Sequence, residues 1–102
     1  MGVLQADDDT LLIDAEDYPK EYVPVGKEHQ KAWEYLAASN LDWTFACPPH
    51  ILNEGPTGDF ITTANFLPIP NKYEIKAGDL ALFMLSELER NEFIGKRVGI
   101  TN

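Results

Sequence analysis

The sequence predicts an α/β fold in which parallel strands are joined by crossover helices. Two observations carry this prediction. Helical and extended patterns follow one another along the chain in the order helix, strand, long loop, helix, strand. The clearest strand pattern is apolar on both of its faces, which is typical of a parallel sheet that is covered on both sides. The chain has 102 residues, a length that suits one small domain spanning residues 1–102.

The first helix is expected over residues 24–39. Pro24 suits its first turn, where the missing N–H of proline has no partner to lose. Apolar residues at three- and four-residue steps define one face, made of Val25, His29, Ala32, Trp33, Leu36 and Ala37. The pattern predicts that His29 is packed or partly buried, and that Glu28 and Lys31 pair weakly on the opposite face.

Further elements are expected along the rest of the chain. Residues 41–47 are rich in aromatic and β-branched side chains and end at two prolines, which predicts a strand. A short strand is expected over 59–64, a second helix over 80–90 and a closing strand over 96–101. Phe83, Met84 and Leu88 share one face of the second helix, and Asp79 complements the dipole at its start. The apolar patch at 11–13 fits either a short strand or a helix.

Charge and composition exclude several functions. The chain carries 17 acidic and 8 basic residues, and its net charge is −9. We therefore expect no nucleic-acid partner and no anionic membrane surface, since both require a cationic face. No apolar run approaches the ~20 residues that span a bilayer, and the first residues do not resemble a secretory signal. The lone Cys47 forms no internal disulfide, so a reducing cytoplasmic location is expected.

The carboxyl ends of parallel strands are where such sheets bind ligands. The residues Cys47, Pro48, Pro49 and His50 follow the clearest strand. His50 is thus the best-placed titratable residue, suited to general acid work or to a ligand hydrogen bond, with a plain surface histidine as the alternative. Cys47 has no neighbouring cation, so the sequence favours an inert packed thiol over a nucleophile. Two histidines without a third ligand predict no metal site.

A glycine-rich phosphate loop is absent from these 102 residues. The glycines Gly55 and Gly58 lie in a long loop with a proline between them, and no helix follows directly. Cradling a phosphate requires bare glycine backbone that opens straight into the amino end of a helix. The sequence therefore predicts no dinucleotide site of the usual kind within the chain itself.

Four segments resemble the second half of a Rossmann-fold family. They are KEHQKAWEYL (27–36), LDWTFACPPHI (41–51), GPTGDF (55–60) and IKAGDLA (75–81). The resembled family is the atypical short-chain dehydrogenase/reductase group, which includes NmrA-like proteins, NADH-flavin reductase-like proteins and the biliverdin/flavin reductases. The resemblance covers nearly the whole chain, with the segments in the same order. It implies a partial Rossmann-like fold that corresponds to the C-terminal half of an NAD(P)-binding reductase.

The resemblance also implies roles for particular residues. In that family the segment matching Pro48, Pro49 and His50 lies at the nicotinamide end of the cofactor. Cys47, Pro48 and Pro49 are therefore expected as cofactor-binding residues. A histidine in the position of His50 lies near the substrate in the flavin-reductase branch, which makes His50 the expected catalytic residue.

The loop after this segment is the second region to which the resemblance assigns a role. Thr57, Gly58 and Phe60 match the substrate-side loop and are expected as substrate-binding residues. The glycine-rich first half of the family fold has no counterpart in these residues. We therefore expect no cofactor for the isolated chain, and NAD(P)H only where a partner half completes it.

Three hypotheses about function follow from the sequence. The chain is a truncated or remnant reductase-like protein without activity of its own, or half of an NAD(P)H-dependent flavin reductase that a second chain completes. The third hypothesis is a self-associating interaction or small-ligand module. Partners expected from this reasoning are a second copy in a homo-dimer and an N-terminal-half protein. The dimer is expected because a strand that is apolar on both faces needs neighbours and cover.

Overall fold

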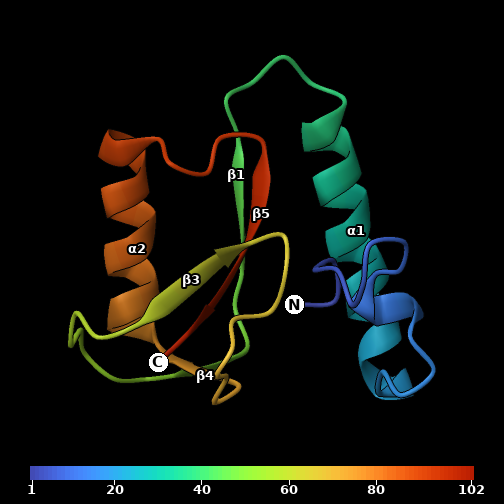
Figure 1. The fold of residues 1–102 in the computed structure, drawn as a ribbon, viewed down its shortest axis with the longest axis horizontal. Helices are drawn as coiled ribbons and strands as arrows, with labels where there is room; N and C mark the ends of the chain where they lie inside the picture. The colour runs from blue at the N-terminus through green and yellow to red at the C-terminus, as the bar shows by residue number, and fades with distance from the viewer.

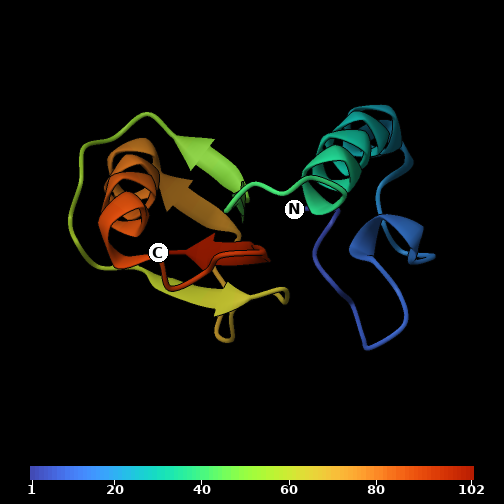
Figure 2. The same cartoon turned by 90° about the horizontal axis from the view of Figure 1, so that it is seen from above.

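The computed structural model describes residues 1–102 and arranges them in three layers (Figure 1). A sheet lies in the middle, helix α2 (Ala77–Arg90) covers one face, and helix α1 (Val23–Ala37) lies with the amino-terminal segment on the other side, as Figure 2 shows. The helix–strand–helix–strand order is the predicted one. The α/β class expected from the sequence is therefore confirmed.

The main sheet has three strands in the order β1 (Thr44–Cys47), β5 (Lys96–Thr101) and β3 (Ile61–Ala64). Strands β1 and β5 are parallel, with Thr44 opposite Lys96 and Cys47 opposite Gly99. Strand β3 pairs with the other edge of β5 in the antiparallel direction, which the sequence pattern did not predict. The parallel pair joined through helix α2 is the part that was predicted, and it leaves one edge of β1 without a strand neighbour.

The two faces of the sheet bury two separate apolar clusters. Val98 and Ile100 of β5 pack with Phe83 of α2 and with Ile75. The opposite face packs on the amino-terminal segment, where Cys47 lies in a cluster with Val3 and Leu4. Strand β1 contributes to both, because Ala46 packs against the first cluster and Phe45 against the second. Successive strand residues point to opposite faces, so apolar residues at both parities match this two-sided cover.

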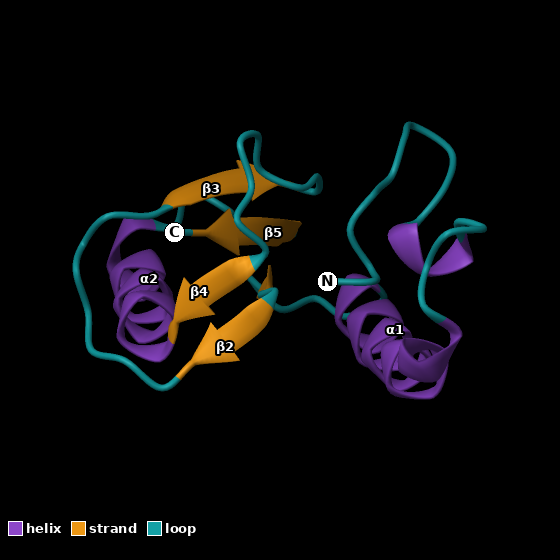
Figure 3. Ribbon diagram, turned by 90° about the horizontal axis from the view of Figure 1, so that it is seen from below, coloured by secondary structure: helices purple, strands orange, loops and turns teal.

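A second, two-stranded parallel sheet pairs β2 (His50–Leu52) with β4 (Glu74–Lys76), and Figure 3 shows both strands beside the main sheet. The sequence did not predict either strand. The pair is linked to the end of β5 through Asn102, whose N–H donates to the Glu74 carbonyl oxygen at 3.1 Å and whose Oδ1 accepts from Lys76 N–H at 2.7 Å.

Helix α1 has its predicted position but not its predicted burial. It spans Val23–Ala37, has Pro24 in its first turn, and carries the expected ion pair between Lys31 Nζ and Glu28 Oε1 at 3.2 Å. The expected apolar face is largely solvent-exposed, because Val25 is 52% exposed and His29 is exposed as well. The prediction of a packed His29 is therefore wrong. Within α1 only Gly26 is buried, and the half-buried residues are Val23, Gln30, Trp33 and Leu36.

Some element boundaries also differ from the prediction. Helix α2 begins at Ala77 rather than at residue 80, and β1 begins at Thr44 rather than at residue 41. The apolar patch at 11–13 forms neither a strand nor an α-helix; it overlaps a short 3-10 helix, η1 (Leu12–Asp14). A second 3-10 helix, η2 (Lys20–Tyr22), directly precedes α1. The closing strand over 96–101 agrees with the prediction.

Neither helix has the length and apolarity that crossing a bilayer requires.

Candidate functional site

The carboxyl end of β1 carries the segment expected to meet a ligand. Cys47 ends the strand opposite Gly99 of β5, and Pro48 and Pro49 follow as half-buried residues. Proline cannot donate to a strand ladder, which explains why pairing with β5 stops at this point. His50 comes next, exposed, and its N–H donates to the Tyr73 carbonyl oxygen at 3.3 Å.

The Cys47 thiol is a packed side chain. It is 2% exposed and donates to the carbonyl oxygen of Phe45 at 3.4 Å. Burial, the strongest effect, raises the pKa of this thiol, and the nearby amino terminus, Val98 N–H and Arg97 oppose the shift more weakly. A thiol with a raised pKa is a poor nucleophile. The inert thiol that the sequence favoured agrees with this environment.

The Arg97 guanidinium ties three segments together behind β1. It lies 4.3 Å from the centre of the Trp33 ring on α1, a cation–π geometry. Its Nη1 donates to the Val3 carbonyl oxygen at 2.8 Å and its Nη2 to Gln5 Oε1 at 3.0 Å. Burial chiefly lowers the pKa of Arg97, which remains a cation at neutral pH. This contact fixes the amino-terminal segment and α1 against the sheet.

The long loop after β2 is held by one carboxylate, Asp79 in the first turn of α2. Its Oδ1 accepts from Thr57 N–H at 2.7 Å and from Gly58 N–H at 2.9 Å, while its Oδ2 accepts from the Thr57 hydroxyl at 2.8 Å. Asn102 Nδ2 donates to the same Oδ2 at 2.8 Å. Four donors from two distant parts of the chain, the turn at Thr57 and Gly58 and the carboxyl-terminal Asn102, therefore converge on one fully buried residue.

The electrostatics of Asp79 follow from these contacts. Burial raises the pKa of the carboxyl, but the hydrogen bonds from the backbone of Thr57 and Gly58 and from the side chains of Thr57 and Asn102 outweigh that effect. The pKa falls from its ordinary value of 3.8 to about 2. The carboxylate stays ionised at neutral pH and acts as an acceptor only. Its chemistry is that of an anchor for the loop.

The expected substrate-side residues lie in different surroundings. The N–H and hydroxyl of Thr57 are both engaged by Asp79. Gly58 adopts a φ of +78°, a left-handed conformation that glycine accepts without a steric penalty. Phe60 is half-buried and packs edge-on against Phe83, with ring centres 6.4 Å apart. Phe60 is thus largely a core side chain.

Six clefts lie on the surface, and the expected site residues are spread unevenly among the three that are described next. The largest, about 840 Å³, lies between the amino-terminal segment and the loop that follows β3. Gly58 and Phe60 line a second cleft of about 450 Å³ beside Arg90. A third, of about 190 Å³, lies between α2 and β1. Cys47, Pro48, Pro49, His50 and Thr57 line none of these three, so the structure does not gather the expected residues in one cleft.

The sequence analysis did not identify two buried carboxylates that hold loops of the fold in place, those of Asp79 and Glu87. Asp79 was assigned only to the helix dipole, although a carboxylate in the first turn of a helix is also a candidate acceptor for a preceding loop. Glu87 is buried near the end of α2 and accepts from Phe93 N–H at 2.7 Å and from Glu92 N–H at 3.1 Å. The sequence signal for Glu87 was a single acidic residue within the apolar stripe of the second helix.

No three His, Cys, Asp or Glu residues lie close enough together to hold a metal ion.

Comparison with known proteins shows which protein family the chain resembles in sequence and in fold. A family model described as NAD(P)H-binding matches residues 1–91. The structure of a Burkholderia pseudomallei protein, provisionally named an exported protein, is 31% identical in sequence and has a TM-score of 0.86. The match covers 99% of this chain and 51% of the Burkholderia pseudomallei chain. A Streptococcus pneumoniae structure, provisionally named an NADH-flavin reductase, is 28% identical with a TM-score of 0.86 over the same shares.

A more distant structure agrees in fold alone. It is a Bacteroides thetaiotaomicron protein provisionally named an epimerase, 20% identical with a TM-score of 0.73, and the match covers 98% of this chain and 49% of its own. No curated protein is similar enough in sequence to match. The chain spans about half the length of the solved structures that it matches. With the family model covering residues 1–91 and a Rossmann-like fold, the chain belongs to the NAD(P)H-binding family.

Proposed function

We propose that these 102 residues form the substrate-side half of an NAD(P)H-dependent, flavin-reductase-like oxidoreductase, and that they have no cofactor binding or reductase activity on their own. The observation that carries the proposal is the Cys47–His50 segment at the carboxyl end of β1, the edge strand that pairs in parallel with β5. Ligands of open α/β sheets bind beyond the carboxyl ends of the strands.

The second part of the proposal rests on the phosphate groups of the cofactor. Dinucleotide pyrophosphates are held by glycine backbone that opens into a helix amino terminus. The amino end of α1 is preceded by the η2 turn and Pro24, and the amino end of α2 is preceded by β4 and crossed by the loop that Asp79 holds. Neither end presents free glycine backbone to a pyrophosphate. We therefore assign cofactor affinity to a completed fold only.

His50 is the residue that we propose for work at the reacting end of that completed fold. Its side chain is exposed, and the ion pairs of the chain involve other residues, Lys27 with Asp14 and Lys31 with Glu28. An exposed imidazole can donate a proton or a hydrogen bond to a bound ligand. Cys47, Pro48 and Pro49 would shape the wall beside it. We further propose a reducing cytoplasmic location, on the ground that the lone Cys47 is buried and free.

The test uses a chimera in which the half of the Streptococcus pneumoniae protein outside the matched region precedes Met1. We expect this chimera to bind NADPH and to reduce flavin. His50→Ala should lower turnover at least tenfold and leave the melting temperature unchanged, whereas His29→Ala, an exposed histidine on α1, should change neither. Turnover that survives His50→Ala in a chimera that binds NADPH would remove His50 from the proposal. A folded chimera without NADPH affinity would overturn the proposed function itself.

A further inference from the structure

The cleft of about 840 Å³ has both of its walls in these residues. One wall belongs to the amino-terminal segment and includes Leu12 and Asp17, and the other belongs to the segment 63–73, at the end of β3 and after it. Strand β3 is at the edge of the main sheet opposite β1. A half-fold that joins the unpaired edge of β1 would therefore leave both walls of the cleft in place.

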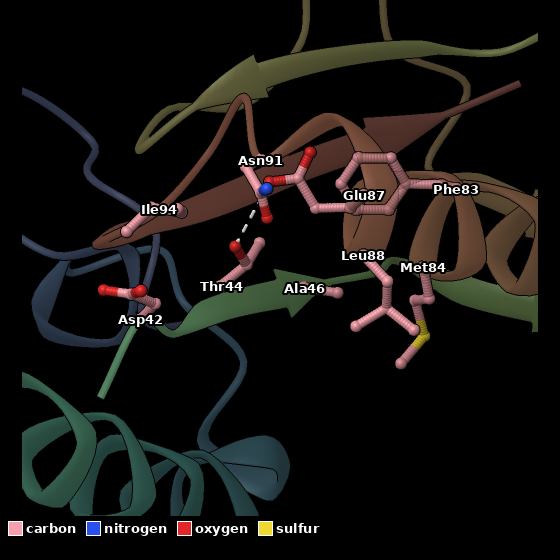
Figure 4. A pocket seen from close by; sticks show the side chains of 9 residues that line it. All are labelled: Asp42, Thr44, Ala46, Phe83, Met84, Glu87, Leu88, Asn91 and Ile94. Carbon is pink, nitrogen blue, oxygen red and sulfur yellow. Dashed lines mark hydrogen bonds between the residues drawn. The ribbon is translucent and has the colours of Figure 1, made fainter.

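Volume separates this cleft from the groove between α2 and β1 that Figure 4 shows. Pockets that bury a cofactor or another small molecule occupy about 300–1,000 Å³. The groove has about 190 Å³, and its carboxylate, Glu87, already accepts a hydrogen bond from Thr44 Oγ1 at 3.3 Å. The cleft of about 840 Å³ lies within the range of ligand pockets and can admit a ring system.

Apolar and aromatic side chains dominate the lining of the cleft. Seven of its twelve lining residues are hydrophobic, which is typical of a small-molecule pocket. Among them are two aromatic residues, Phe66 and Tyr73, which are 37% and 55% exposed. Aromatic side chains stack on other flat, conjugated rings. The lining therefore suits a flat ring ligand.

The backbone at Tyr73 is held in a conformation that bulky residues rarely adopt. Its φ is +57°, in the left-handed region. Tyr73 N–H donates to Asn71 Oδ1 at 2.7 Å, and the Tyr73 carbonyl oxygen accepts from His50 N–H at 3.3 Å. Strained residues of this kind gather at ligand-binding sites. The second hydrogen bond also joins this wall of the cleft to the residue proposed for the reacting end.

Asn71 carries the one buried side-chain polar atom that has no hydrogen-bond partner, its Nδ2. The orientation of the amide is fixed, because its Oδ1 accepts from Tyr73 N–H. A buried donor without an acceptor is unfavourable and requires an explanation. Asn71 lines the cleft, so a carbonyl oxygen on a bound ring would supply the missing acceptor.

Charge limits which ring ligands the cleft accepts. Asp17 is the only charged residue in the lining, and it is exposed. Arg97 contacts Gln5 of the same wall, but its guanidinium is already engaged by three groups. Lys72 belongs to the opposite segment and does not line the cleft. A phosphate group therefore meets a like charge and no cation, on a chain whose net charge is −9.

We propose that this cleft binds an uncharged, flat, carbonyl-bearing substrate, an unphosphorylated flavin, and that Asp17 selects against its phosphate ester. The choice of a flavin rests on the proposed function, whereas the preference for the uncharged form rests on the lining alone. Phe66 and Tyr73 contact the ring, and Asn71 Nδ2 donates to a ring carbonyl oxygen. Asp17 sets specificity by repelling a phosphate and takes no part in the reduction.

Fluorescence-quenching titrations of riboflavin and of its phosphate ester FMN into the 102-residue chain at low ionic strength test the proposal. The two ligands differ by one phosphate group, so the ratio of their dissociation constants measures the effect of that group. We expect riboflavin to bind about tenfold more tightly than FMN. Asp17→Lys should increase the affinity for FMN about tenfold and leave the affinity for riboflavin unchanged, and added salt should reduce both differences.

Glu89→Lys is the matched control for charge. Glu89 is exposed on α2 and lines none of the three clefts, and its substitution changes the net charge by the same amount as Asp17→Lys. It should change the affinity for FMN by less than about twofold, since a distant exposed charge is screened. Phe66→Ala, with unchanged far-ultraviolet circular dichroism, should weaken the binding of both flavins by the same factor.

Three results would overturn the proposal. A chain without saturable riboflavin binding would show that the cleft is not a flavin site. Equal affinities for riboflavin and FMN, or equal gains in FMN affinity for Asp17→Lys and Glu89→Lys, would show that Asp17 does not select the ligand. Riboflavin binding that a folded Phe66→Ala variant retains in full would place the ligand elsewhere. None of these titrations contains NADPH, so a chimera that fails to bind NADPH overturns the proposed function separately.

Discussion

At the scale of single residues, the carboxylate of Asp79 organises the loop on which substrate-side roles were expected. It accepts hydrogen bonds from Thr57, Gly58 and Asn102, and so joins the loop, the start of α2 and the carboxyl end of the chain. Because the Thr57 donors are already used, any ligand at this loop meets the outer surface of a fixed turn. The role that remains for Thr57 is to position the loop.

The Asp79 carboxylate should make stability depend on acid. Its pKa is depressed from 3.8 to about 2 in the folded chain, so its contribution is complete above pH 3.8 and is lost as the pH falls through about 2. Urea unfolding followed from neutral pH to pH 2 should show this loss. Asp79→Asn should be less stable than the wild type at neutral pH, because its amide N–H groups face donors, and the difference should shrink toward pH 2.

Asp7→Asn is the matched control, since the exposed Asp7 also has a lowered pKa but only caps a local turn through Asp9 and Thr10. This variant should stay near wild-type stability at neutral pH. A stability difference between wild type and Asp79→Asn that does not change with acid would contradict the assignment of Asp79 as a buried ionised anchor.

The contact of Arg97 with Trp33 gives a second prediction at this scale. Arg97→Ala removes a cation–π contact and two hydrogen bonds and should lower the free energy of unfolding by about 2 kcal/mol. Arg97→Lys keeps the charge but not the planar fork, and should lose about 1 kcal/mol. The exposed Arg90→Ala should stay within about 0.5 kcal/mol of wild type. Equal losses for Arg97→Ala and Arg90→Ala in denaturant titrations would contradict this account.

Sequence reasoning reached some of these residues and missed the contacts of others. The burial and low reactivity of Cys47 followed from a strand that is apolar on both faces. Asp79 was placed correctly at the start of a helix, but the donors that meet it lie more than twenty residues away in either direction. Contacts of that separation depend on how the loop folds back, which no local pattern records.

At the scale of elements, the accuracy of the prediction follows the length and regularity of each pattern. Helix α2 has an apolar stripe along fourteen residues, and β5 alternates Val98 and Ile100 with smaller or polar residues. Both were predicted, although α2 begins three residues earlier than expected. Strands β2 and β4 have three residues each, too few for an alternating pattern to be recognised, and they exist because they pair with each other. The burial of α1 was overestimated, because an apolar stripe predicts which face can be covered and does not show whether anything covers it.

The crossing of the 54–58 loop over the start of α2 gives a prediction at this scale. Gly78 N–H donates to the Glu54 carbonyl oxygen at 2.9 Å, and a side chain at Gly78 would collide with the backbone of Gly55 and Pro56. Gly78→Ala should therefore cost about 1–3 kcal/mol of stability and increase amide exchange in residues 54–58.

Gly55→Ala is the control for this crossing, because nothing lies within 4 Å of a methyl group at that position. It should be neutral or slightly stabilising, since alanine restricts the unfolded chain. If Gly78→Ala and Gly55→Ala had equal stability and equal exchange, the loop would not cross the helix as closely as described.

At the scale of the whole molecule, the chain buries two apolar clusters and leaves apolar side chains of both helices exposed to solvent. Its two apolar clusters lie on the two sides of β5, while β1 and α2 leave an edge and a helix face open. The α/β class was predictable because it depends on element order. The antiparallel direction of β3 was not, because it depends on the path of the long loop through the Asp79 contacts.

Isothermal titration calorimetry of NADPH and NADH into the 102-residue chain tests the central claim most directly. The glycine at the amino end of α2, Gly78, already donates its N–H to the Glu54 carbonyl oxygen and is covered by the backbone of Gly55 and Pro56, so it offers no free cradle for a pyrophosphate. We predict no heat of binding for either nucleotide at micromolar to millimolar concentrations. A saturable isotherm with a micromolar dissociation constant for either nucleotide would contradict the claim, because it would show that the substrate-side half holds the cofactor by itself.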